Sequence, residues 1–261
     1  MSKQKAKPLV NSSVNSQIKE IIVMDIGGTH IRFARVKNNK ISDFIKKDTP
    51  KNKNKLLKEL VNGIKNYVNK NTKGIGIACA GVIENGAVKT SPNLPIENFN
   101  LKKYLQPKLK KRLKIENDAN CAALAEARFG IKKKNFFVLT LGTGIGGGII
   151  INGNLYKGEY GAGELGHIII DNGKDFEYHY KKSKKSMAKM SNYIGQGIAS
   201  LISILDPEEI VLAGGMKNLG KPFLNNIKKE TGKYIPKNRI PKIMWSKIKH
   251  PSLLGANLLI N

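Results

Sequence analysis

The chain has 261 residues, a formal net charge of +27 and only two cysteines, Cys79 and Cys121. Hydrophobic residues make up 40% and charged residues 25% of it, which is ordinary for a globular protein. No run of 18 or more apolar residues occurs, so we expect no membrane span. Because both cysteines lie in apolar surroundings, we expect buried thiols in a cytoplasmic protein and no disulfide framework.

The excess of lysine suggests a nucleic-acid partner as one hypothesis. The lysines are spread along the chain and mixed with asparagines, and no interleaved aromatic residues accompany them. We therefore expect a solvated, lysine-rich surface without a specific nucleic-acid site. Charge alone would still give weak attraction to polyanions.

The first half of the chain predicts alternating strands and helices. Residues 1–19 are polar, and we expect them to form a flexible N-terminal extension. A three-stranded meander is expected next, with strands 21–26, 31–37 and 41–47. Helices and strands then alternate: helix 53–70, strand 74–81, loop 91–95, helix 101–112, strand 115–116 and helix 119–129.

The second half begins with the same element as the first. A strand ending in Asp25-Ile26-Gly27-Gly28-Thr29 is repeated as a strand ending in Thr140-Leu141-Gly142-Thr143-Gly144. Glycine leaves no Cβ in the way, so backbone N–H groups of such turns can approach phosphate oxygens. Two turns that face each other would clamp a nucleotide polyphosphate. The remaining predicted elements are strands 136–141, 146–151 and 210–213 and helices 191–205 and 251–260.

This repeat predicts an α/β protein of two lobes with a central cleft. We expect a small N-terminal lobe at 20–118, joined by the C-terminal helix at about 251–261. A large C-terminal lobe should cover 119–250.

Asp25 stands at a strand end beside the first glycine turn, where its carboxylate could hold Mg²⁺ through water. A plain β-hairpin with a glycine turn is the alternative. Neither glycine turn is a Walker A loop, because G-x-x-x-x-G-K-[ST] does not occur. Neither fits a Rossmann fingerprint, because a strand follows the run at Gly142–Gly147.

Asp118 lies between a short strand and an alanine-rich helix. A carboxylate there could accept the proton of a hydroxyl group, or it could cap the helix, and the two roles can coexist. Glu164 and His167 follow a run of glycines that we expect to form a long flexible loop. Together they could hydrogen-bond sugar hydroxyls, or they could be solvated bystanders.

Six segments together resemble the ROK family (repressor, open reading frame, kinase), which belongs to the sugar kinase and actin-like ATPase group with its ribonuclease H-like fold. They occur in the family's order and span roughly residues 20–260. The segments are Asp25–Thr29, Ser91–Pro95, Glu116–Asn120, Leu141–Gly148, Gly161–His167 and Asp206–Gly215.

The resemblance implies an ATP- and Mg²⁺-dependent sugar kinase that forms a homodimer. Asp118 matches the family's catalytic base, and Gly214 and Gly215 match the turn against the nucleoside. The implied sugar ligands are Asn93, Asn117, Glu164 and His167, with Glu177 as a further one if 176–178 aligns with the family. The implied phosphate-binding residues are Gly27, Gly28, Thr29, Gly142, Thr143 and Gly144.

Two departures from the family pattern affect the expected site. Many members carry three cysteines downstream of the histidine as zinc ligands, whereas no cysteine follows Cys121 here. We therefore expect no structural zinc. The second departure is Ile96-Glu97, where many members have Gly-Trp, and both changes bear on the identity of the sugar.

Several functions fit these observations. Glucose is the first expected acceptor, and N-acetylglucosamine or N-acetylmannosamine is the alternative. A sugar-responsive repressor belongs to another class, and such relatives carry an N-terminal helix-turn-helix for which about 20 polar residues leave no room. A sugar-binding protein without activity is a third reading, which the presence of Asp118 disfavours.

Overall fold

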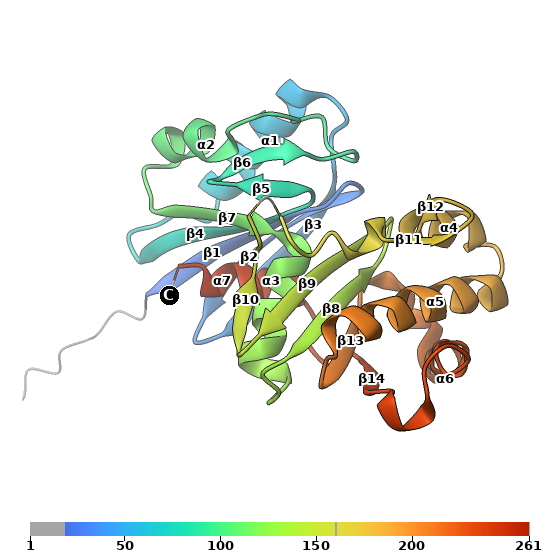
Figure 1. Ribbon diagram of the computed structural model, residues 1–261. Helices are drawn as coiled ribbons and strands as arrows, with labels where there is room; N and C mark the ends of the chain where they lie inside the picture. Colours follow the sequence, from blue (N-terminus) through green and yellow to red (C-terminus); the bar gives the residue numbers. More distant parts are fainter. Residues whose placement is uncertain (1–18, 160, 261) are drawn as a thin grey trace, which may run out of the picture.

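The computed structural model describes residues 19–159 and 161–260, and its core is two five-stranded sheets (Figure 1). The strands of the first sheet follow the order β3-β2-β1-β4-β7, and those of the second follow β10-β9-β8-β13-β14. The first sheet contains β1 (Glu20–Ile26), β2 (His30–Lys37), β3 (Lys40–Asp48), β4 (Thr72–Cys79) and β7 (Leu113–Asn117). The second contains β8 (Phe136–Leu141), β9 (Ile145–Ile151), β10 (Asn154–Tyr156), β13 (Glu209–Ala213) and β14 (Lys242–Trp245).

The two sheets have one topology. In each, the first three strands form an antiparallel meander, and the last two are parallel to the first. The helices recur in matching places: α1 (Lys53–Lys65) and α5 (Met187–Leu205), α2 (Leu101–Leu109) and α6 (Gly220–Thr231), and α3 (Asp118–Ala125) and α7 (Pro251–Leu258). The repeat seen in the sequence is therefore a repeat of the fold, and the predicted α/β class is confirmed.

Strand β1 is buried along its whole length because both faces of its sheet are covered. Ile22 and Met24 point into the core under α1 and α2, whereas Ile21 and Val23 pack with residues of α7. Side chains of successive strand residues point to opposite faces, so the uninterrupted apolar run Ile21–Met24 suits a strand that is covered on both faces. The second sheet packs in the same way against α5 and α6.

The last helix of each half crosses to the other sheet. Helix α3 packs on β8 and β9, and α7 packs on β1 and β4, so the two helices lie side by side between the sheets (Figure 1). Helix α7 approaches both α3 and β4 very closely: a Cβ on Gly255 would lie 1.7 Å from the carbonyl oxygen of Cys121 in α3, and one on Gly76 in β4 would lie 1.9 Å from that of Ala256 in α7. Only glycine fits at these contacts.

Most predicted elements are confirmed, with different ends. Helix α1 ends at Lys65 rather than at residue 70, and α2 ends at Leu109, because Lys110 adopts a left-handed conformation with φ 50°. The helix predicted over 119–129 passes into a π-helical turn at Glu126–Gly130. The predicted extension at 1–19 lies, apart from residue 19, outside the described residues.

Several short elements were not predicted. The hairpins β5 (Val82–Glu84) with β6 (Ala87–Thr90) and β11 (Ile169–Asp171) with β12 (Lys174–Asp175) have only two to four residues per strand, too few for a periodicity to stand out. Helices α4 (Phe176–Ser183) and α6 and strand β14 were also missed. No helix in the described ranges is long and apolar enough to span a membrane.

Candidate active site

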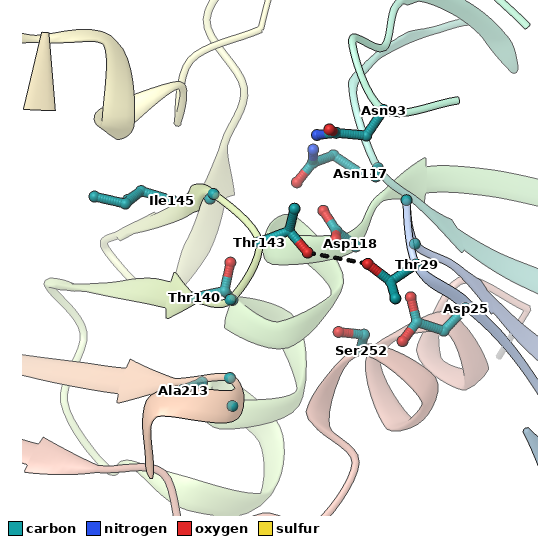
Figure 2. Close-up of a pocket in the computed structure, with 18 of the residues that line it drawn as sticks. Asp25, Thr29, Asn93, Asn117, Asp118, Thr140, Thr143, Ile145, Ala213 and Ser252 are labelled. Carbon is teal, nitrogen blue, oxygen red and sulfur yellow. Dashed lines mark hydrogen bonds between the residues drawn. The ribbon is translucent and has the colours of Figure 1, made fainter. Parts of the chain in front are cut away.

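A cleft of about 880 Å³ lies between the two lobes. The ends of β1, β4 and β7 reach it from one side, and the ends of β8 and β13 reach it from the other. Parallel strands of a sheet end at the same edge, so the turns that follow them gather there. Figure 2 shows side chains from both lobes pointing into this space.

The two glycine turns face each other across the cleft. The Thr29 and Thr143 hydroxyl oxygens are 3.3 Å apart, and this hydrogen bond is the dashed line in Figure 2. All six residues of the turns line the cleft: Gly27, Gly28, Thr29, Gly142, Thr143 and Gly144. The paired arrangement that the repeat predicted is thus present.

Asp118 lies at the seam between the lobes, as the first residue of α3. The helix cap is Asn117, whose Oδ1 accepts hydrogen bonds from the N–H groups of Ala119 and Asn120 at 2.9 and 3.0 Å. The expectation that Asp118 itself caps the helix is therefore wrong. Asp118 Oδ1 does accept a hydrogen bond from the N–H of Ala119 at 2.9 Å, and no side chain in the described part of the chain pairs with its carboxylate.

Burial raises the pKa of Asp118 to about 7, and the negative charge of Asp25 adds to the shift. The backbone hydrogen bond from Ala119 opposes it only in part. A carboxyl group with a pKa near neutrality is well matched to the uptake of a proton from an alcohol.

Two amides lie beside this carboxylate. Figure 2 shows Asn93 and Asn117 next to each other above Asp118, with their amide groups in the cleft. Asn117 Nδ2 donates to the Gly81 carbonyl oxygen at 3.0 Å, which fixes its orientation. The Asn93 amide has no hydrogen-bond partner within residues 19–159 and 161–260, so it is free to bind a ligand hydroxyl.

Asp25 is buried at the end of β1, and Arg32 Nη1 donates to its Oδ2 at 2.7 Å. Burial raises the pKa of Asp25, and the Arg32 charge opposes this effect. No cluster of three or more acidic, histidine or cysteine ligands exists among the described residues. One carboxylate beside a glycine turn is a donor set that Mg²⁺ can use, because this ion is commonly held by one or two carboxylates, waters and substrate phosphates.

Glu164 and His167 line the far side of the cleft. Asp175 Oδ2 lies 2.9 Å from His167 Nδ1, and Glu164 Oε2 lies 3.9 Å from His167 Nε2. The hydrogen bond to Asp175 raises the pKa of His167 above its ordinary value, because it favours the charged ring.

This raised pKa can be measured directly. An NMR titration of His167 should give a pKa above 6.5, and Asp175→Asn should move it back toward 6.5. The raised pKa of His167 contributes stability that is fully present below the pKa of this histidine in the unfolded chain. The contribution is lost as pH rises through the pKa of His167 in the folded protein. Equal titration curves of His167 in both proteins would contradict the pairing.

Glu177 lies on α4 and also lines the cleft. Its Oε2 accepts a hydrogen bond from the Ile145 N–H at 2.6 Å, and its Oε1 pairs with Lys181 at 2.5 Å. The carboxylate thus lies against the second glycine turn, and its role as a sugar ligand stays a prediction.

The sequence pattern missed a basic group of residues at the other end of the cleft. It comprises Arg32, Lys46, Lys217, Lys249 and His250, and Phe44 stacks on His250 with ring centroids 4.6 Å apart. Ser252 on the first turn of α7 also lines the cleft (Figure 2). Gly214 and Gly215, which follow β13, lie in the same cleft. In a chain with 46 lysines and arginines, single basic residues carry no sequence signal.

Comparison with known proteins assigns the chain to a family. The sequence profile described as "ROK family" matches residues 21–179 and 173–261. The chain belongs to the ROK family. The resemblance read from the six motifs is therefore confirmed.

ROK relatives of two kinds match this chain. It is 30% identical to a glucokinase from Halalkalibacterium halodurans over 220 residues, 62% of this chain and 67% of that protein. It is also 34% identical to a xylose repressor from Caldicellulosiruptor bescii over 174 residues, 60% of this chain but only 43% of the repressor. A ROK glucokinase from Streptomyces griseus, solved with glucose and AMPPNP, shares its fold with a TM-score of 0.81, at 23% identity over 92% of this chain and 98% of that one.

The structure brings the residues singled out by the ROK motifs into one cleft. Asp118 and the two asparagines lie on the side of the first lobe, and Glu164, His167 and Glu177 lie on the side of the second. The glycine turns lie between these residues and Gly214-Gly215. One cleft thus has an acidic end and a basic end.

Proposed function

We propose that this protein is an ATP-dependent hexose kinase that phosphorylates the primary hydroxyl of a sugar, with glucose as the first candidate. The observation that supports this most directly is the position of Asp118. One carboxylate without a side-chain partner lies at the seam of a cleft, next to two facing turns whose N–H groups suit phosphate oxygens.

In the proposed reaction, Asn93 and Asn117 orient the sugar by hydrogen bonds to its hydroxyl groups. Asp118 accepts the proton of the primary hydroxyl, whose oxygen bonds to the γ-phosphorus while the bond to the β–γ bridging oxygen breaks and ADP leaves. Catalysis of phosphoryl transfer depends chiefly on such positioning and on charge stabilisation.

The phosphates of the donor would lie between the glycine turns, and its nucleoside would lie toward Gly214 and Gly215. Asp25 would hold Mg²⁺ through water, and the ion, when bound, would offset negative charge on the β- and γ-phosphates. Closure of the lobes would exclude water from the cleft and limit hydrolysis of ATP.

An N-acetylglucosamine or N-acetylmannosamine kinase is the alternative within this class. A measurement of ADP release with glucose, both N-acetyl amino sugars, mannose and fructose separates these acceptors. We expect the highest kcat/KM with glucose. A preference for an amino sugar would replace glucose as the substrate, and no sugar-dependent ADP release at all would refute the kinase.

The similarity to a xylose repressor keeps a sugar-responsive regulator as a candidate of another class. A DNA-binding assay over a range of salt concentrations tests it beside the kinase assay. Binding that vanishes at moderate salt and is indifferent to sugar would reflect charge alone. We also propose a homodimer and the lobe limits of 20–118 and 119–250, which rest on the family resemblance and the sequence.

Asn93 offers a test of the sugar site. Asn93→Ala should raise the KM for the sugar about 3–10-fold, the loss expected for one hydrogen bond between neutral groups, and leave the KM for ATP unchanged. Steady-state kinetics with each substrate varied in turn measures both. Asn54→Ala, an exposed substitution on α1, is the control. An unchanged KM for the sugar would remove Asn93 from the site.

A further inference from the structure

Two lysine side chains donate hydrogen bonds to backbone carbonyl oxygens of the two glycine turns, one lysine to each turn. Behind the first turn, Lys51 Nζ donates to the Gly28 carbonyl oxygen at 2.6 Å. Behind the second, Lys184 Nζ donates to the Thr143 carbonyl oxygen at 2.9 Å and to that of Gly142 at 2.8 Å. Neither ammonium group forms an ion pair with a carboxylate in the described ranges.

A hydroxyl group completes each arrangement. Thr49 Oγ1 donates to the Gly27 carbonyl oxygen at 2.6 Å, and the Tyr180 hydroxyl donates to that of Gly142 at 2.9 Å. When Asp25 is aligned with Thr140, Gly27 corresponds to Gly142. One hydroxyl therefore holds the first of the two carbonyls in each turn.

The lysines correspond in the same alignment, since Gly28 matches Thr143. They also correspond in the fold, because each lies just before one of a pair of matching helices, Lys51 before α1 and Lys184 before α5. The hydroxyl groups come from different elements, since Thr49 follows β3 whereas Tyr180 lies on α4, which has no counterpart in the first lobe. The lysine contact is therefore present in both halves of the repeat.

Holding these carbonyls at the back has a consequence at the front. The C=O and N–H of a trans peptide point in opposite directions. Each held carbonyl shares a peptide group with the N–H of the next residue. The N–H groups of Gly28, Thr29, Thr143 and Gly144 therefore point to the side of the turn opposite to the lysines. None of these four donates a hydrogen bond to another group within the described residues, although all four residues line the cleft.

The lysines also add charge. Burial lowers the pKa of Lys184, and the neighbouring Lys181 adds to the effect. An anion between the turns would favour the charged form of Lys184, because opposite charges nearby stabilise each other.

We propose that Lys51 and Lys184 are a matched pair of positioning residues, which aim the free N–H groups of both turns at the phosphates of a nucleoside triphosphate. This inference rests on the proposed kinase function. It assigns the lysines to the binding of the phosphate donor and not of the sugar, since both contact only the turns and neither is among the residues that line the cleft.

Methionine at either position keeps the length of the side chain and removes its donors and charge. Lys51→Met and Lys184→Met should each raise the Kd and KM for ATP about 10-fold or more, the loss expected for hydrogen bonds from a charged group. The KM for the sugar should stay within twofold of wild type. Lys51→Arg and Lys184→Arg keep a charged donor and should recover part of the ATP affinity.

Lys58→Met and Lys185→Met, at exposed positions close by, are the matched controls. Calorimetry with ATP measures binding without turnover, and thermal unfolding reports any general loss of structure. A lower melting temperature with an unchanged Kd for ATP would give the lysines a purely structural role and overturn the inference.

The outcomes separate this inference from the proposed function. If the wild-type protein is a kinase and the Kd and KM for ATP are unchanged in all four Lys51 and Lys184 variants, the role of the lysines is overturned and the proposed function stands. A wild-type protein that binds ATP but phosphorylates no sugar overturns the function, while the Kd values still test the lysines. A wild-type protein that binds no ATP overturns both.

Discussion

Asp118→Asn should lower the kcat for sugar phosphorylation by about 10²–10⁴-fold, the usual contribution of a general base. The amide has the shape of the carboxyl group but cannot accept the proton. Because Asn117 caps the helix, the substitution leaves the start of α3 intact. The Kd for ATP, measured by calorimetry, should change little.

Glu84→Gln, an exposed substitution on β5, controls for the loss of one carboxylate. A kcat within threefold of wild type in Asp118→Asn would contradict the assignment of the base. An equal loss of kcat in Glu84→Gln would show that net charge, and not position, sets the rate.

The raised pKa of Asp118 gives activity and stability opposite dependences on pH. A base must be ionised, so kcat/KM should rise with pH through about 7 and level off above it. The folded state binds this proton more tightly than the unfolded state, whose carboxyl has a pKa near 3.8. The contribution of Asp118 to stability therefore falls as pH rises from about 4 to 7. Thermal unfolding at pH 8 should give Asp118→Asn the higher melting temperature.

Gly255→Ala should produce the largest loss of stability among single methyl additions to α7. Its Cβ would lie 1.7 Å from the carbonyl oxygen of Cys121, a backbone atom that cannot move without shifting α3. Overpacking of this kind costs about 1–3 kcal/mol and occasionally more. Chemical denaturation should show the loss as a lower midpoint.

Gly232→Ala is the matched control, since a Cβ there meets its nearest atoms at 3.4 Å or more and φ is −67°. It should be neutral or slightly stabilising. Because Asp118 begins the same helix as Cys121, any folded Gly255→Ala protein should also lose activity. Equal midpoints for the two variants would show that the helices separate without cost.

Much of the site could be predicted because many of its residues belong to short sequence motifs. The turns at Gly27–Thr29 and Gly142–Gly144 follow apolar strands, and their repetition predicts two sheets that end at one cleft. The choice between cap and base at Asp118 could not be made, since Asn117 and Asp118 are both good caps and only the backbone decides between them.

The other omissions have physical causes as well. The packing of α7 depends on Gly255, which meets α3, and on Gly76 of β4, and a glycine in a sequence does not reveal what approaches it. Lys51 and Lys184 gave no signal, because lysine is frequent throughout this chain. Helix α4 has only eight residues, and two of its four buried residues, His179 and Ser183, are polar, so its buried face has no apolar pattern in the sequence.

The exchange of α3 and α7 between the sheets ties the halves of the chain together during folding. A polypeptide severed between Gly130 and Phe136 would leave each fragment holding the helix that seals its neighbour's sheet. Either fragment alone would expose the apolar face of its own sheet that the missing helix covers, and it would aggregate. Mixed in equal amounts, the two could complement each other and rebuild the native fold.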